Sequence, residues 1–241
     1  MRAVLSILIA LQAGPAAADE HLVPGVSVFA NGGAADGYYR LVATAFAPLL
    51  QRNVAVRMIA MPAFHPEYAV GIAYFEDGTE RIVALDPAQM LGVYTQLELM
   101  RNGSIKVSKD GGFTFEKDEQ GIAELEAKMP KDPRDLKIAR CERPIDGALV
   151  KRIRAAWESV VYRTRYDAPV YQGDVEIVTL TADADHYHFS LGDGIGGETA
   201  DPSPESAPGR LLALAEALRV QCRDGSAASL AGLEAALKAA E

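Results

Sequence analysis

The run from Asp185 to His188 carries the side chains of this sequence that are best suited to chemistry. Alternate side chains of a β-strand point to opposite faces, so His186 and His188 are predicted to share one face. Two imidazoles on one face can bind a transition metal if a third ligand completes the set. The candidate ligand residues are Asp185, His186, His188, Asp193 and Glu198, with Asp201 as a further source of the third ligand.

A metal is not the favoured interpretation of these residues. The remaining histidines, His21 and His65, are far away in the sequence, and the spacing matches no ligand set that identifies a particular metal. A strand with two histidines on a solvent-facing side accounts for the same pattern. We therefore assign no metal and no cofactor, and we expect neither zinc nor calcium to bind tightly.

The segment 192–197 contains four glycines and resembles a phosphate-binding loop only at first sight. Such a loop leads directly into the N-terminus of a helix, where backbone N–H groups receive the anion. Here Pro202 and Pro204 stand before the next expected helix. The stretch 192–204 is therefore predicted to be a flexible loop rather than a nucleotide site.

The N-terminus has the pattern of a secretory signal peptide over residues 1–18. Arg2 supplies a positive charge, Val4–Leu11 an apolar run, and Ala16–Ala18 a small-residue cleavage site. The apolar run is shorter than the roughly 20 residues that cross a bilayer, so we expect cleavage and no membrane span. The sequence thus predicts a soluble protein that is periplasmic or secreted.

Export gives the two cysteines a structural interpretation. In an oxidising compartment their even number predicts a single disulfide between Cys141 and Cys222. The bond would close a loop of about 80 residues and stabilise the fold by about 4 kcal/mol, because it restricts the unfolded chain. A redox-active pair would require a C-x-x-C arrangement, which this sequence lacks.

Two amphipathic helices are expected within the region that the cysteines bound. The first spans 146–166 and has a strongly basic face opposite its apolar stripe, and the second spans 208–222. Trp157, the only tryptophan, lies in the middle of the first stripe, so we expect its ring to be buried. The stripe consists of Leu149, Val150, Ile153, Ala156, Trp157, Val160, Val161 and Thr164.

Shorter elements are predicted on both sides of this region. Asp77-Gly78 joins two β-rich runs and is typical of a two-residue type I′ hairpin turn. Asp86-Pro87 is a favourable start for a helix over 86–100. The other expected elements are strands at 54–60, 68–75, 80–85 and 136–141, helices at 36–47, 118–129 and after Ser226, and hairpins of 105–108 with 113–116 and of 174–181 with 185–191.

Strands that come in hairpins favour an α+β fold over a parallel sheet that alternates with helices. We therefore predict antiparallel hairpins packed with amphipathic helices and one structural disulfide. Residues 19–241 are expected to form a single domain, with a candidate sub-boundary at 130–135 that would separate two α+β halves. The alternative is one mixed sheet with helices on one face.

Several features follow one another along the chain: Cys141, Trp157, Arg165-Tyr166, His186-Tyr187-His188-Phe189, a proline-rich loop and a leucine-rich helix that ends at Cys222. Pro66-Glu67-Tyr68 and the strand Arg81–Leu85 precede them. This order resembles a group of exported bacterial proteins of unassigned function, over most of the chain after residue 18. The resemblance implies no activity and no catalytic residues.

The charge of the chain limits the classes of partner. The formal net charge is −9 at pH 7, which argues against a nucleic-acid binder because phosphate contacts need clustered Lys and Arg. Between Arg165 and Arg210 lie 44 residues with nine acids and no Lys or Arg. Such a stretch could meet the basic helix face or attract a cation or a basic partner.

We therefore expect an exported binding or interaction protein whose unidentified partner is a protein or a small molecule. An inhibitor-like or immunity-like role against a basic envelope enzyme fits the charge. The alternative is an envelope hydrolase that uses His186 and His188, with or without a metal, although no Gly-x-Ser-x-Gly motif is present. A cleft in which histidines and carboxylates converge would favour the enzyme, and outward-facing histidines would favour the binding protein.

Overall fold

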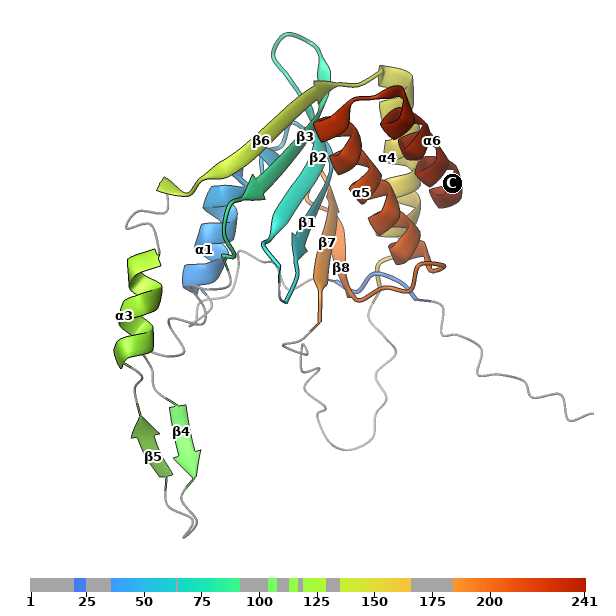
Figure 1. Ribbon diagram of the computed structural model, residues 1–241. Helices are drawn as coiled ribbons and strands as arrows, with labels where there is room; N and C mark the ends of the chain where they lie inside the picture. The colour runs from blue at the N-terminus through green and yellow to red at the C-terminus, as the bar shows by residue number, and fades with distance from the viewer. Residues whose placement is uncertain are drawn as a thin grey trace, which may run out of the picture.

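The computed structural model describes residues 20–24, 36–63, 65–91, 104–107, 113–116, 119–128, 135–165 and 184–241. Its centre is a six-stranded sheet in the order β6-β3-β2-β1-β7-β8, and every strand pair is antiparallel (Figure 1). The predicted α+β class with antiparallel hairpins is confirmed. Of the alternative, one mixed sheet with helices on one face, the shared sheet is found, but its strands are antiparallel and helices cover both faces (Figure 1). The strands are β1 (Val54–Met61), β2 (Tyr68–Tyr74), β3 (Glu80–Pro87), β6 (Ile138–Pro144), β7 (His186–Leu191) and β8 (Gly196–Ala200).

Helices cover both faces of this sheet (Figure 1). On one face lie α4 (Gly147–Val161), α5 (Ala207–Asp224) and α6 (Ala227–Ala240), which share a core with the strands. On the other face lie α1 (Asp36–Ala45) and the short 3-10 helix η1 (Ala47–Leu49), which form a second core. Because both faces are covered, the central strands are buried almost continuously instead of in alternation.

The basic helix predicted over 146–166 is α4, and Trp157 is fully buried in it, as expected. Asp146 caps the N-terminus, since its carboxylate accepts hydrogen bonds from the N–H groups of the first turn. The helix ends at Val161, five residues before the predicted end. The next turn tightens to i−3 hydrogen bonds, and the N–H of Arg165 then donates to the carbonyl of Leu22.

The hairpin around Asp77-Gly78 is confirmed, but the predicted type I′ turn is wrong. A type I′ turn needs positive φ at both central residues, and in this hairpin only Gly78 has it, at 79°. The N–H of Phe75 donates to the carbonyl of Thr79, which leaves a connection of three residues. The carboxylate of Asp77 accepts from the N–H of Thr79 and holds this wider turn.

The predicted helix start at Asp86-Pro87 is wrong, because both residues belong to β3. Asp86 pairs with Ala139 of β6, and its carboxylate is taken by arginines of α5 instead of capping a helix. Residues 92–100, the rest of that predicted helix, lie outside the described residues.

The predicted loop 192–204 contains a strand, β8, and this expectation is also corrected. Asp193 accepts a hydrogen bond from the N–H of Ile195 in a tight turn, after which β8 pairs with β7. The edge of the sheet offers backbone partners that outweigh the poor strand propensity of glycine. The strand predicted at 174–181 lies outside the described residues.

The remaining predicted elements are found close to their expected places. Ser206 and Ser226 cap α5 and α6 through their side chains, and Gly225 ends α5 in the left-handed conformation. A small hairpin of β4 (Ser104–Val107) and β5 (Phe113–Glu116), followed by α3 (Glu119–Lys128), lies to one side of the sheet (Figure 1). Among the described residues, no helix is both long and apolar enough to span a bilayer.

Segments from both ends of the chain complete the sheet. Strands from before and after 130–135 share it, since β6 pairs with β3 and β7 pairs with β1.

The predicted signal peptide, 1–18, lies outside the described residues. Shortly after it, Leu22 is fully buried in the core of α4 and α5, and Val23 pairs with Glu198 at the edge of β8.

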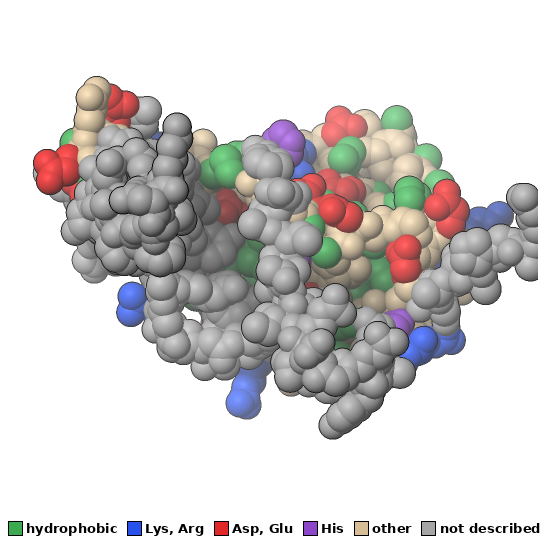
Figure 2. Space-filling view, turned by 90° about the horizontal axis from the view of Figure 1, so that it is seen from below, with side chains coloured by type: hydrophobic (Ala, Val, Ile, Leu, Met, Phe, Trp, Pro, Cys, Tyr) green, Lys and Arg blue, Asp and Glu red, His purple; other side chains and the backbone are tan. Residues whose placement is uncertain are grey.

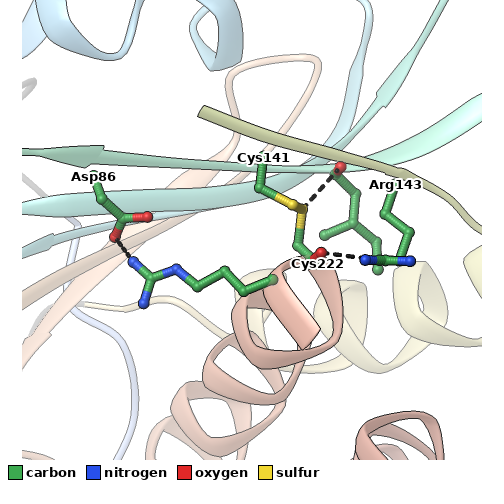
Figure 3. Close-up of a disulfide and its surroundings, with 6 residues drawn as sticks. Asp86, Cys141, Arg143 and Cys222 are labelled. Atoms are coloured by element: carbon green, nitrogen blue, oxygen red, sulfur yellow. Dashed lines mark hydrogen bonds and ion pairs between the residues drawn. A yellow bond between two sulfur atoms is a disulfide. The ribbon is translucent and has the colours of Figure 1, made fainter. Parts of the chain in front are cut away.

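The predicted disulfide between Cys141 and Cys222 is confirmed, with the Cα atoms 6.0 Å apart (Figure 3). Cys141 lies on β6 opposite Ala84 of β3, and Cys222 lies in the last turns of α5. Beside the disulfide, Nε of Arg143 donates a hydrogen bond of 2.9 Å to the carbonyl oxygen of Cys222. The C-terminal end of α5 is therefore fixed to the edge of the sheet.

Loss of this disulfide should destabilise the protein strongly. The bond spans 81 residues, so replacement of both cysteines by serine should lower the free energy of unfolding by about 4 kcal/mol in chemical denaturation. Thiol labelling of the unfolded, unreduced protein should find no free thiol, and labelling after reduction should find both. Two labelled thiols without reduction would contradict the assignment.

Candidate functional site

Four side chains form a row across one end of the sheet, on the face covered by α5. Ala60 of β1 pairs with Tyr68 of β2 on one side and with Tyr187 of β7 on the other. Ala69 pairs with Leu85, which places Tyr68 level with Asp86 of β3. Since neighbouring strands are about 4.8 Å apart, the two tyrosines are about 10 Å apart, with the small, fully buried Ala60 between them.

Helix α5 places charged side chains above this row. Nε and Nη2 of Arg219 donate to Oδ1 of Asp86 over 3.0 and 2.7 Å, and Arg223 reaches the same oxygen. The guanidinium of Arg219 lies 3.7 Å from the centre of the Tyr68 ring, a cation–π contact. Nη1 of Arg219 also contacts Glu216 at 3.3 Å. The two arginines are thus matched by two carboxylates.

A pocket of about 450 Å³ opens between the row and α5. Its floor includes the buried Glu67, whose Oε2 accepts a hydrogen bond of 2.6 Å from the N–H of Leu91. Asp and Glu side chains gather on this end of the molecule, which Figure 2 views directly. The pocket is lined by Pro62, His65, Pro66, Glu67, Tyr68, Asp86, Pro87, Asp185, Tyr187, Arg219 and Arg223.

Asp185 immediately precedes β7 and lies beside Tyr187. Its Oδ1 accepts a hydrogen bond of 2.9 Å from the N–H of Ala63, and its Oδ2 is 3.5 Å from the Tyr187 hydroxyl. The backbone N–H of Asp185 donates to Oδ1 of Asp201, which brings a second carboxylate close. One oxygen of Asp185 therefore accepts a hydrogen bond from the backbone, and the other has a single long contact with the described residues.

Both tyrosines are held in the neutral form. Burial raises the pKa of Tyr187 to about 12, and the negative charge of Asp185 adds to this effect. Burial also raises the pKa of Tyr68, and the neighbouring Glu216 raises it further. At neutral pH both hydroxyl groups therefore keep their proton, which Tyr68 directs at Glu216 and Tyr187 at Oδ2 of Asp185.

The structure brings His188 together with Glu198, and Asp185 with Asp201, but it separates these two pairs. Asp185 lines the pocket, whereas His188 lies on the opposite face of the sheet, where its Nε2 is 2.9 Å from Oε2 of Glu198. His186 lies two residues before His188, opposite Ala200. Asp193 closes the β7–β8 turn. In the described part of the chain, no group of three His, Cys, Asp or Glu side chains could hold a metal.

The sequence analysis missed most of the pocket. Arg219 and Asp86 are 133 residues apart, and the only local signal was the spacing of Glu216, Arg219 and Arg223 on one side of a helix. That spacing is equally typical of an exposed helix face. Tyr68 belongs to Pro66-Glu67-Tyr68, one of the features on which the resemblance to exported bacterial proteins rests. No chemical role was predicted for it.

Comparisons of the chain with known protein families, curated proteins and solved structures find no match. They add no support to the resemblance to exported bacterial proteins, which stays a prediction. Function is therefore inferred from the geometry of the described residues alone.

The raised pKa of Tyr187 predicts a loss of stability in alkali. Its pKa in the folded protein, about 12, exceeds the ordinary value of 10.0, so folding favours the protonated phenol. This contribution is complete below pH 10.0 and is lost as the pH rises towards 12. The free energy of unfolding should fall over that interval, and it should fall less steeply in Tyr187→Phe. Equal slopes in the two proteins would contradict the prediction.

Proposed function

We propose that the protein is an exported binding protein whose ligand enters the pocket between the sheet and α5. The observation that carries this proposal is a pocket of about 450 Å³ whose walls come from strands distant in sequence and from α5. Small-molecule sites commonly have volumes of about 300–1,000 Å³. They also combine apolar or aromatic walls with a few polar groups, as Tyr68, Tyr187 and Asp185 do here.

The walls of the pocket are held in place before any ligand binds. The disulfide fixes α5 one turn away from Arg219, and Arg219 is bonded to Asp86 and stacked on Tyr68. A site that is already ordered loses less conformational entropy on binding than a flexible one does. This favours a binding role for the pocket over a merely structural gap.

A periplasmic or secreted location belongs to the same proposal. The N-terminal pattern of residues 1–18 supports it, and so does the bonded pair of Cys141 and Cys222, since disulfides persist in oxidising compartments. An inhibitor-like or immunity-like role is supported only by the net charge of −9. A pocket of this size favours a small ligand, or a single side chain of a partner, as the group that is recognised.

The alternative of an envelope hydrolase has less support. A histidine that activates a serine needs a free ring nitrogen near the hydroxyl group. Nε2 of His188 is paired with Glu198, which leaves Nδ1, but among the described residues no hydrogen bond joins His188 to a serine. The hydroxyl oxygen of Ser190 accepts a hydrogen bond of 2.7 Å from Nε of Arg57. Neither His186 nor His188 lines the pocket.

Thermal-shift screening of the mature protein against a library of small metabolites tests the proposal. A ligand that binds only the folded state raises the melting temperature, by an amount that corresponds to about 2.7 kcal/mol at a hundredfold excess over Kd. We expect at least one compound to stabilise the wild type and to lose its effect on Tyr187→Ala.

Tyr162→Ala is the matched control, because Tyr162 is 57% exposed at the end of α4 and does not line the pocket. The ligand should stabilise this variant as it stabilises the wild type. Circular dichroism of both variants checks that they remain folded. A screen without any stabilising compound, or stabilisation that survives in Tyr187→Ala, would refute the pocket as the binding site.

A further inference from the structure

The pocket contains two pairs of a tyrosine and an aspartate, one on each side of Ala60. In the first pair, Tyr68 and Asp86 together hold the guanidinium group of Arg219. The ring centre lies 3.7 Å from the guanidinium carbon, and Oδ1 of Asp86 lies 2.7 Å from Nη2. An aromatic face and a carboxylate thus act together on one cation, which is a favourable environment for an organic cation.

The second pair, Tyr187 and Asp185, has the same residue types but no cation. Both side chains line the pocket. In the described part of the chain, no Lys or Arg pairs with Asp185 and none lies over the Tyr187 ring. Oδ1 of Asp185 accepts from the backbone N–H of Ala63, and Oδ2 has only the 3.5 Å contact with the tyrosine hydroxyl. This carboxylate therefore keeps capacity to accept from a ligand.

We propose that Tyr187 and Asp185 bind the guanidinium or primary ammonium group of a small ligand. The proposal rests on the proposed function, since it names the class of ligand for the same pocket. A guanidinium or ammonium group donates to Oδ2 of Asp185 and lies against the Tyr187 ring, as Arg219 does against Tyr68. The rest of the ligand fills the remainder of the pocket.

The charges around the pocket favour a cation over an anion. Arg219 and Arg223 pair with Asp86, and Arg219 also contacts Glu216, so these four charges cancel, and the buried Glu67 adds a carboxylate to the same half. The other half has Asp185 and the adjacent Asp201, with no matching base among the described residues. These carboxylates also contribute to the raised pKa of Tyr187, because their negative charge disfavours ionisation of its hydroxyl group.

A nuclear magnetic resonance titration of the folded mature protein tests the proposal. The probes are n-butylguanidinium and n-butylammonium, with neutral n-butanol and anionic butyrate as controls of equal chain length. We expect both cations to shift the backbone resonances of Asp185 and Tyr187 in a saturable way. The neutral and anionic controls should leave these resonances unchanged.

Two variants assign the contact. Asp185→Asn keeps an oxygen that can accept from Ala63 and removes the charge, and it should weaken binding of both cations by at least about tenfold. Asp193→Asn removes one negative charge from the β7–β8 turn, outside the pocket, and should bind as the wild type does. Equal affinities in Asp185→Asn and the wild type would overturn the proposal.

The remaining outcomes separate this inference from the proposed function. Binding of butanol or butyrate at the same resonances, as tightly as the cations, would overturn the cationic class while the pocket remained a binding site. Failure of both cations would likewise overturn this inference alone, and the proposed function would fail only if the metabolite screen also found no ligand.

A blocked Gly-Ser-Arg-Ser-Gly peptide distinguishes the source of the cation. Tighter binding of the free probes would support a small ligand, and tighter binding of the peptide would replace it by an arginine of a protein partner.

Discussion

The docking of the last turns of α5 against the sheet is the constraint on which the pocket depends. Two interactions of different kinds fix it within four residues of the helix: the ion pair of Arg219 with Asp86 and the disulfide of Cys222 with Cys141. The disulfide restricts the unfolded chain, whereas the ion pair fixes one orientation of the helix on the sheet. Asp86 is largely buried, and its charge would be uncompensated if the helix were rotated away from it.

The docked helix α5 forms the pocket together with the end of the sheet. Strand register alone brings Tyr68, Ala60 and Tyr187 side by side, but they would form an open surface without a helix above them. Arg219 closes one side of the pocket and neutralises Asp86. On the other side of the pocket, the negative charge of Asp185 is not matched by a Lys or Arg among the described residues. The asymmetry of the pocket therefore follows from a single arginine. Its chemical consequence is a preference for a cation at the unfilled end.

Local patterns predicted much of this fold and little of the site. The helix around Trp157, the helix that begins after Ser226 and the disulfide follow from apolar periodicity, capping chemistry and cysteine count, which act over a few residues or depend on the compartment. Asp86 was read as a helix cap because its true partner, Arg219, lies 133 residues away. His186 and His188 share a face as expected, yet the pocket forms on the opposite face, with Tyr187. Such long-range pairings require strand order and register, which one sequence does not provide.

The central claim is that the pocket between the sheet and α5 is a ligand site, and a crystallographic fragment screen tests it most directly. Crystals of the mature protein would be soaked with fragments that are cationic, neutral and anionic. We predict electron density for cationic fragments between Tyr187 and Arg219, with the positive group within hydrogen-bonding distance of Asp185. A pocket that stays empty in every soak, while fragments bind elsewhere on the protein, would contradict the claim.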